Sequence, residues 1–190
     1  MPRIAIGIDQ SYSGCAVVTY SSLTGADVAR FDFSPKAAGT GIDRLVHVHD
    51  TLSNHFLQIT AGGQVTHVCH EGYSYGSKFR REELGELGCA MKLALALILP
   101  HHVERRIHAV APATVKKFVT GSGRADKDKM MMAVYKRWGF EPANNDVADA
   151  YALARIAGAL ADPEPPELKF QQEALDTIRR PPKTRSKTAA

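Results

Sequence analysis

Three strand-like segments at the start of the chain constrain its fold more than any other feature. They span residues 3–10, 14–21 and 27–34, are rich in apolar residues, and are separated only by short polar segments. This spacing predicts three neighbouring antiparallel strands. Apolar periodicity then predicts helix 41–59, strand 64–72, helix 82–99, strand 105–112 and helices 113–121, 125–138 and 144–160. The order predicts an α/β protein with a mixed sheet flanked by helices.

The chain of 190 residues fits one domain, which we expect to span residues 1–162. The Pro-rich segment "ADPEPPE" at 161–167 is typical of a helix end, and it predicts a polar, basic C-terminal tail over 163–190. After Asp176 the tail has no acidic residue and five basic ones: Arg179, Arg180, Lys183, Arg185 and Lys187. Two interpretations stay open for it: an arm attracted to phosphate, or an unstructured solubilising tail.

The net charge and the cysteines indicate which kind of partner the protein binds and where in the cell it is located. The formal net charge of +4 favours a polyanionic partner. The apolar run 93–100 is far shorter than the roughly 18 residues that span a bilayer, so no membrane association is expected. The three cysteines are odd in number and widely spaced, with no CxxC motif, so neither a disulfide framework nor a zinc site is indicated. We expect an intracellular, cytoplasmic protein.

Asp9 is the first candidate functional residue, because it stands in the strand-like run "IGIDQSYSGCAVV". Aspartate is rare in strands, and a buried carboxylate is costly unless a partner neutralises it. Asp9 could simply open the turn "DQSYSG". It could instead face a cation, which would require further carboxylates at the same place.

Three other acids could supply those carboxylates. Glu71 closes a later strand, and Asp146 and Asp149 lie three residues apart at the start of a helix, on one face. Each has a simpler interpretation: Asp146 as the N-cap, both aspartates as favourable charges at the helix dipole, and Glu71 as a loop acid. Together they predict an all-oxygen site suited to Mg²⁺ or Mn²⁺.

Five segments carry a family resemblance: "GIDQSYSG", "HEGYSYG", "LGELGCAMKLAL", "APATVKKFVTGSGRADKDKM" and "NNDVADAYALA". With these, residues 3–160 resemble the RuvC-type Holliday junction resolvases of the ribonuclease H-like superfamily, in their phage-like branch. The resemblance implies a ribonuclease H-like α/β fold, a mixed five-stranded sheet of three antiparallel strands followed by parallel strands. Gln10 departs from the family, which has Pro after the first aspartate.

The resemblance also implies an activity and a site. The activity is resolution of four-way DNA junctions by paired symmetric nicks, through hydrolysis with two Mg²⁺ ions per site, for which Mn²⁺ is a plausible substitute. The implied metal ligands are Asp9, Glu71, Asp146 and Asp149, with Lys116 and Lys127 acting on the phosphate. The helix at about 82–99 would form a homodimer interface, although its apolar seam alone is equally typical of a core helix.

Basic residues predict a DNA-binding surface. Residues 105–137 contain nine Lys and Arg residues and only two Asp, a pattern suited to phosphate contact. Either Tyr73 or Tyr75 stands where the family has an aromatic residue that wedges into the junction. The predicted DNA contacts are Tyr73, Tyr75, Lys78, Arg80, Arg81, Lys116, Lys117, Arg124, Lys127 and Lys129.

Three alternatives remain at this stage. The segment "GIDQSYSG" also resembles the phosphate hairpin of actin-like kinases and ATPases, but the chain has no second hairpin. A looser nuclease for flaps, forks or packaging intermediates would share the same acids. A non-catalytic protein of the same fold could bind branched DNA, although a costly cluster of four acids argues for catalysis.

Overall fold

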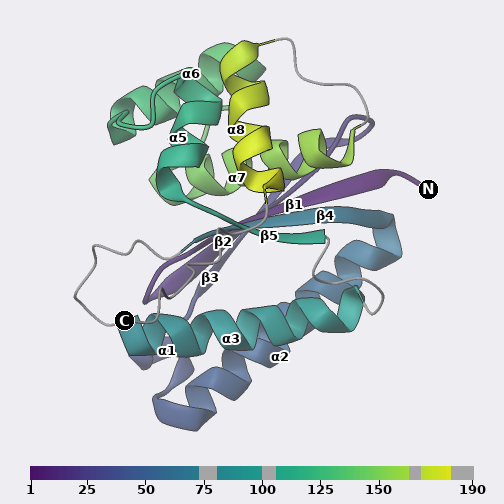
Figure 1. Cartoon of the computed structure of the whole chain (residues 1–190). Helices are drawn as coiled ribbons and strands as arrows, with labels where there is room; N and C mark the ends of the chain where they lie inside the picture. Colours follow the sequence, from purple (N-terminus) through teal and green to yellow (C-terminus); the bar gives the residue numbers. More distant parts are fainter. Residues whose placement is uncertain (73–80, 100–105, 163–167, 181–190) are drawn as a thin grey trace, which may run out of the picture.

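A computed structural model describes residues 1–72, 81–99, 106–162 and 168–180. The chain forms three layers, with a central sheet between two layers of helices (Figure 1). One helical layer contains α1 (Pro35–Ala38), α2 (Gly41–Gly62) and α3 (Arg81–Ile98). The other contains α5 (Pro112–Thr120), α6 (Lys127–Trp138), α7 (Asn145–Ala161) and α8 (Lys169–Arg179).

The sheet has five strands: β1 (Arg3–Gln10), β2 (Gly14–Ser21), β3 (Gly25–Asp32), β4 (Gln64–Glu71) and β5 (Ile107–Val110). Their spatial order is β3-β2-β1-β4-β5. Strands β1, β2 and β3 pair antiparallel, whereas β4 is parallel to both β1 and β5. The predicted mixed five-stranded sheet is therefore confirmed.

Side chains on the two faces of β1 belong to two separate apolar cores. Ile6 and Ile8 are fully buried against the layer of α2 and α3. Ala5 belongs to the core on the opposite face, beneath α7. Because side chains alternate along a strand, Asp9 points to the same face as Ala5. The acid therefore lies on the side of the sheet that α7 covers.

Gly7 lets α7 pack directly on β1. A Cβ atom at Gly7 would lie 2.0 Å from the carbonyl oxygen of Ala150 and 2.2 Å from the backbone nitrogen of Ala154. No side chain fits in that space, so only glycine allows the helix backbone to come this close. The contact fixes the height of α7 above the strand that ends at Asp9.

The C-terminal segment differs from its predicted form. Residues 168–180 were expected to belong to a polar tail, but they contain α8, in which Ala174 and Leu175 are fully buried. The side chain of Gln171 donates a hydrogen bond to the carbonyl oxygen of Phe118 on α5, at 3.2 Å. The prediction of a tail from residue 163 is therefore wrong for 168–180, because burial of the apolar face of α8 stabilises the helix. The last basic residues, from 181 onward, lie outside the described part.

No helix in the described part of the chain is long and apolar enough to span a membrane. The longest helix, α2, has several charged and polar residues along its 22 positions. Only its inner face is buried, including Val48, Leu52 and Phe56.

Candidate active site

Asp9 and Glu71 meet at the ends of two neighbouring parallel strands. The register of β1 and β4 places Ile8 beside His70, one residue before each acid. The carboxyl group of Asp9 donates a hydrogen bond to the carboxylate of Glu71. Two carboxylates this close cannot both carry a full charge, so they share a proton.

Asp146 and Asp149 approach the pair from the first turns of α7. Asn144, not Asp146, caps this helix, because its side-chain oxygen accepts a hydrogen bond from the backbone N–H of Val147 at 2.9 Å. The interpretation of Asp146 as the N-cap is therefore wrong. Both aspartates act electrostatically on Asp9, so the structure brings together acids from β1, β4 and α7.

Burial and the neighbouring negative charges raise the pKa values of Asp9, Glu71 and Asp149. The pKa of Asp9 rises from 3.8 to about 8, first because the side chain is buried and then because Glu71, Asp149 and Asp146 are negative. Burial also raises the pKa of Glu71. For Asp149, burial and the charge of Glu71 raise the pKa to about 6. Such a cluster is electrostatically costly unless cations neutralise it.

Lys116 and Lys127 are the cations whose charges act on this cluster. Lys116 lies on α5 and Lys127 begins α6. Each lowers the pKa of both Glu71 and Asp149, which opposes the effect of burial. Both lysines therefore lie close enough to the acid cluster to affect its charges.

A hollow of about 380 Å³ lies beside Asp9 and Asp146. The turn between β1 and β2 forms one wall, through Ser11 and Ser13, and Arg30 of β3 lies on another. Sequence reasoning did not identify Arg30, because an alternating arginine on an outer strand is typical of a solvent-exposed position. The space allows a ligand to reach the acids from the side of β2 and β3.

Arg44 of α2 holds the turn that follows Asp9, and sequence reasoning missed it as well. Its side chain is buried and donates hydrogen bonds to the carbonyl oxygens of Phe33, at 2.8 Å, and Tyr12. The guanidinium also lies 4.4 Å from the centre of the Tyr12 ring. Arg44 thereby fixes the turn against α2, and the end of β1 with it.

The donor set of the cluster matches the chemistry of a hard divalent cation, because all four side chains offer carboxylate oxygens. In the described part of the chain, however, no three His, Cys, Asp or Glu side chains are already positioned to hold one ion. Metal ligands must be deprotonated, so binding of an ion would require Asp9 and Glu71 to release the proton that they share.

The remaining predicted DNA contacts fall into three groups. Lys117 points away from the acids and forms an ion pair with Glu173 of α8 at 2.8 Å, so its observed role is to hold α8. Arg124 and Lys129 are exposed near the start of α6, where Lys129 pairs with Asp126 at 3.0 Å. Tyr73, Tyr75, Lys78 and Arg80 lie outside the described residues, as does the side chain of Arg81.

Helix α3, the predicted dimer interface, has both a buried and an exposed apolar face. Leu87, Met91 and Leu95 are buried against the sheet and α2. Leu93 and Leu97, four residues apart, are each 57% exposed. The helix therefore belongs to the core and still presents two adjacent leucines at the surface.

The sheet order, its mixed pairing and the two helical layers define a ribonuclease H-like fold. Solved structures share it. The Thermus thermophilus RuvC structure matches with a TM-score of 0.60 and 20% identity, over 80% of this chain and 90% of that one. Thermus thermophilus RuvC in complex with a Holliday junction substrate matches with a TM-score of 0.64 and 18% identity, over 90% and 96%.

A sequence comparison identifies the family. The crossover junction endodeoxyribonuclease RuvC of Anaeromyxobacter sp. (strain Fw109-5) is 33% identical over 168 residues, which covers 84% of this chain and 77% of the relative. No model of a known protein family matches the chain. The chain belongs to the RuvC family of crossover junction endodeoxyribonucleases, so the family prediction is confirmed.

Proposed function

We propose that this protein resolves Holliday junctions by paired symmetric nicks, through phosphodiester hydrolysis that depends on two divalent metal ions. The observation that carries the proposal is the convergence of Asp9, Glu71 and Asp149 with Lys116 and Lys127 at one end of the sheet. Family membership supports the same activity. An enzyme that acts on DNA would be located in the cytoplasm of a bacterial or phage-infected cell.

Each acid would have a defined task. Asp9, at the centre of the cluster, would contact both ions, and Glu71, Asp146 and Asp149 would complete their ligand shells. Mg²⁺ is the proposed ion, with Mn²⁺ as a substitute, because both prefer carboxylate oxygen. When bound, such a pair of ions supplies activation of a water molecule and charge stabilisation at the departing oxygen.

Lys116 and Lys127 would act on the phosphate rather than on the metal. Their charges already reach Glu71 and Asp149. A phosphate seated beside these acids would bring further negative charge, which increases in the transition state. Cations fixed on α5 and α6 would neutralise that charge without reorganising, which is where electrostatic stabilisation is most effective.

Binding of a whole junction would use a wider surface and two subunits. Arg124 and Lys129, exposed beside Lys127, would contact the DNA backbone. The segment 73–81 comes soon after Glu71 in the chain and would supply the wedging tyrosine, Tyr73 or Tyr75, with the basic residues Lys78, Arg80 and Arg81. Leu93 and Leu97 on α3 would pack against a second copy, because paired nicks require two sites in a fixed relation.

Cleavage of a defined set of DNA molecules tests the proposal. Four-way, three-way, flap and linear DNA are incubated with purified protein and Mg²⁺, Mn²⁺ or EDTA. We expect symmetric nicks in the four-way junction only, no cleavage in EDTA, and loss of cleavage but not of junction binding in Asp9→Asn. The exposed Glu141→Gln is the matched control and should cut normally. Equal cleavage of flaps would reduce the protein to a looser branched-DNA nuclease, and full activity of Asp9→Asn would contradict the site.

A further inference from the structure

A second cavity lies at the opposite end of the sheet from the acids. It has a volume of about 360 Å³ and is bounded by the first residues of β1, the end of β2, β4, and the last turns of α7. None of the four acids lines it. Arg3 is at its edge, whereas Asp9 lies six residues further along β1, which corresponds to roughly 20 Å. The cavity is therefore separate from the candidate active site.

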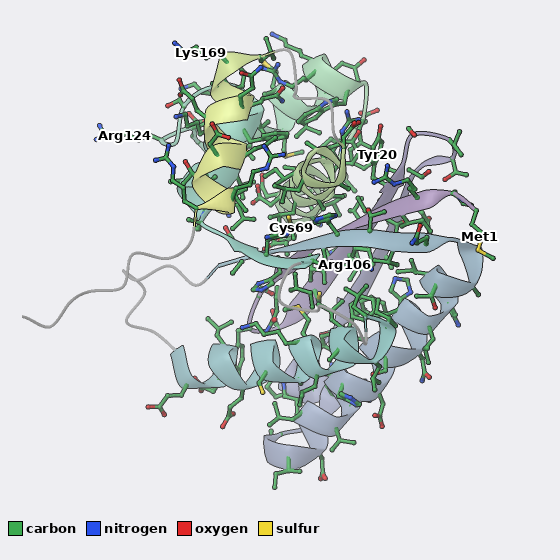
Figure 2. The ribbon with its side chains drawn as sticks, turned by 45° about the vertical axis from the view of Figure 1, so that its right-hand side comes forward. Met1, Tyr20, Cys69, Arg106, Arg124 and Lys169 are labelled. Atoms are coloured by element: carbon green, nitrogen blue, oxygen red, sulfur yellow. The ribbon has the colours of Figure 1, made fainter. Side chains whose placement is uncertain are left out.

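Two guanidinium groups line this cavity, and both are held in place. Arg155 of α7 lies over the rings of Tyr20 and Trp138, at 4.3 and 5.0 Å from their centres, and it also hydrogen bonds to Tyr151. Arg3 donates a hydrogen bond to the carbonyl oxygen of Ala161 at 2.7 Å. Figure 2 shows Tyr20 on the side of the sheet that α7 covers. Guanidinium groups oriented in this way lose little freedom when they bind an anion.

Basic groups outnumber acidic ones among the described residues that line the cavity. Among the described residues that line it, Asp162 is the one carboxylate against Arg3 and Arg155. His67, next to the lining residue Thr66, is influenced by positive charge from Arg106 and Arg179 as well as Arg3. Together with burial, these charges lower the pKa of His67 to about 4, so its ring stays neutral. The surroundings therefore favour a ligand that brings negative charge.

The volume of the cavity and its uncharged lining residues indicate which groups the ligand contains besides its negative charge. Trp138, Phe118 and Ala159 provide an apolar wall, and Ser22 and Thr66 provide hydroxyl groups. Small-molecule sites typically begin at about 300 Å³, and combine apolar walls with a few polar groups that orient the ligand. The volume suits a compact ligand with one phosphate and a flat body, not a long polyphosphate.

We propose that this cavity binds a nucleoside monophosphate, with its phosphate between Arg3 and Arg155 and its base along the apolar side of the cavity, beside Trp138 and Ala159. Arg–phosphate contacts are commonly bidentate, which suits two fixed guanidinium groups. The site is independent of metal ions and of the acids. It would make the protein responsive to free nucleotides through a surface that takes no part in cleavage.

Calorimetric titration of the full chain with deoxyadenosine 5′-monophosphate in EDTA tests the proposal. We expect one site per chain, weaker binding of inorganic phosphate, and still weaker binding of deoxyadenosine. Arg155→Lys keeps the charge but loses the planar fork, and Arg3→Gln removes one cation. Each should weaken nucleotide binding roughly tenfold or more, since a charge-assisted contact is lost. Thermal unfolding verifies that each variant is folded.

Two controls locate the site. Lys36→Gln removes an exposed cation from α1, in the other helical layer, and Asp149→Asn changes the acid cluster; neither should alter nucleotide affinity. The proposal is overturned if the nucleotide does not bind at millimolar concentration, or if deoxyadenosine binds as tightly as its phosphate. It is also overturned if Asp149→Asn changes affinity while folded Arg155→Lys and Arg3→Gln do not. Failure of DNA cleavage would leave this result unaffected.

Discussion

Replacing Asp9 with asparagine should stabilise the metal-free protein, and the gain should increase with pH. In the folded chain the pKa of Asp9 is about 8, against 3.8 for an ordinary aspartate, because the group is buried and faces three other acids. The unfolded chain therefore releases this proton at a much lower pH than the folded chain does. Unfolding is favoured progressively as the pH rises through this range.

The size of the effect follows from the pKa difference. Each pKa unit corresponds to about 1.4 kcal/mol, so ionising Asp9 in the folded state costs at most about 6 kcal/mol. About 2 kcal/mol of this arises between pH 6 and pH 8, because the folded group itself begins to ionise near pH 8. For a chain of this length, 2 kcal/mol corresponds to a change in melting temperature of roughly 4 to 8 °C. Because Asp9 and Glu71 share a proton, these figures are upper bounds for the pair.

Thermal unfolding in EDTA, measured over about pH 5 to pH 9, checks this prediction. The wild type should lose stability steadily from about pH 5 and level off above about pH 8, whereas Asp9→Asn should show a much flatter profile and unfold later at high pH. Glu141→Gln should follow the wild type, since it removes only an exposed carboxylate. Adding Mg²⁺ at pH 8 should raise the melting temperature of the wild type far more than that of Asp9→Asn.

Parallel pH profiles for wild type and Asp9→Asn would refute the reasoning. They would mean that Asp9 ionises at an ordinary pH and that the four acids do not form a strained cluster. If the pH profiles were parallel and Mg²⁺ raised the melting temperature of both proteins strongly, the metal ions would bind at another site.

Three further predictions test individual parts of the structure. Gly7→Ala should lower the free energy of unfolding by about 3 kcal/mol in chemical denaturation, because its Cβ would meet the α7 backbone, whereas Gly62→Ala, with open space around it, should change little. Lys127→Ala should slow single-turnover cleavage about a hundredfold with little loss of junction affinity, whereas Lys129→Ala should weaken junction binding without slowing cleavage of bound DNA; a loss of affinity alone would make Lys127 a DNA tether. Leu97→Asp should yield monomers in sedimentation while Leu23→Asp, in an exposed turn, should not, and dimers of both would exclude α3 as the interface.

The fold and the acid cluster could be predicted because both follow from regular patterns. Alternating apolar residues defined β1, and the parallel pairing of β1 with β4 brings Asp9 beside Glu71 at one edge. The start of α7 could be recognised from its polar residues, although the cap is Asn144 rather than Asp146. These are local signals combined with a simple rule of topology.

Other features depend on tertiary contacts that no local pattern contains. Lys117 and Lys116 are neighbours in sequence and both read as phosphate contacts, but only the position of α8 reveals that Lys117 pairs with Glu173. Arg44 reads as a solvent-exposed helical arginine until α2 is placed against the turn at Tyr12. The Pro-rich segment suggested that folded structure ends near 162, yet Phe170, Ala174 and Ile178 recur at helical spacing beyond it.

The packing of α8 on α5 determines where the chain can be shortened. A protein that ends at residue 162 would lose the buried Leu175 and also Gln171 and Glu173, which bond to Phe118 and Lys117 on the helix that bears Lys116. Its failure to cut DNA would then report a displaced lysine, and would be mistaken for the loss of a DNA-binding arm. Removing only the residues beyond 180 separates these two causes, because the support for α5 remains intact.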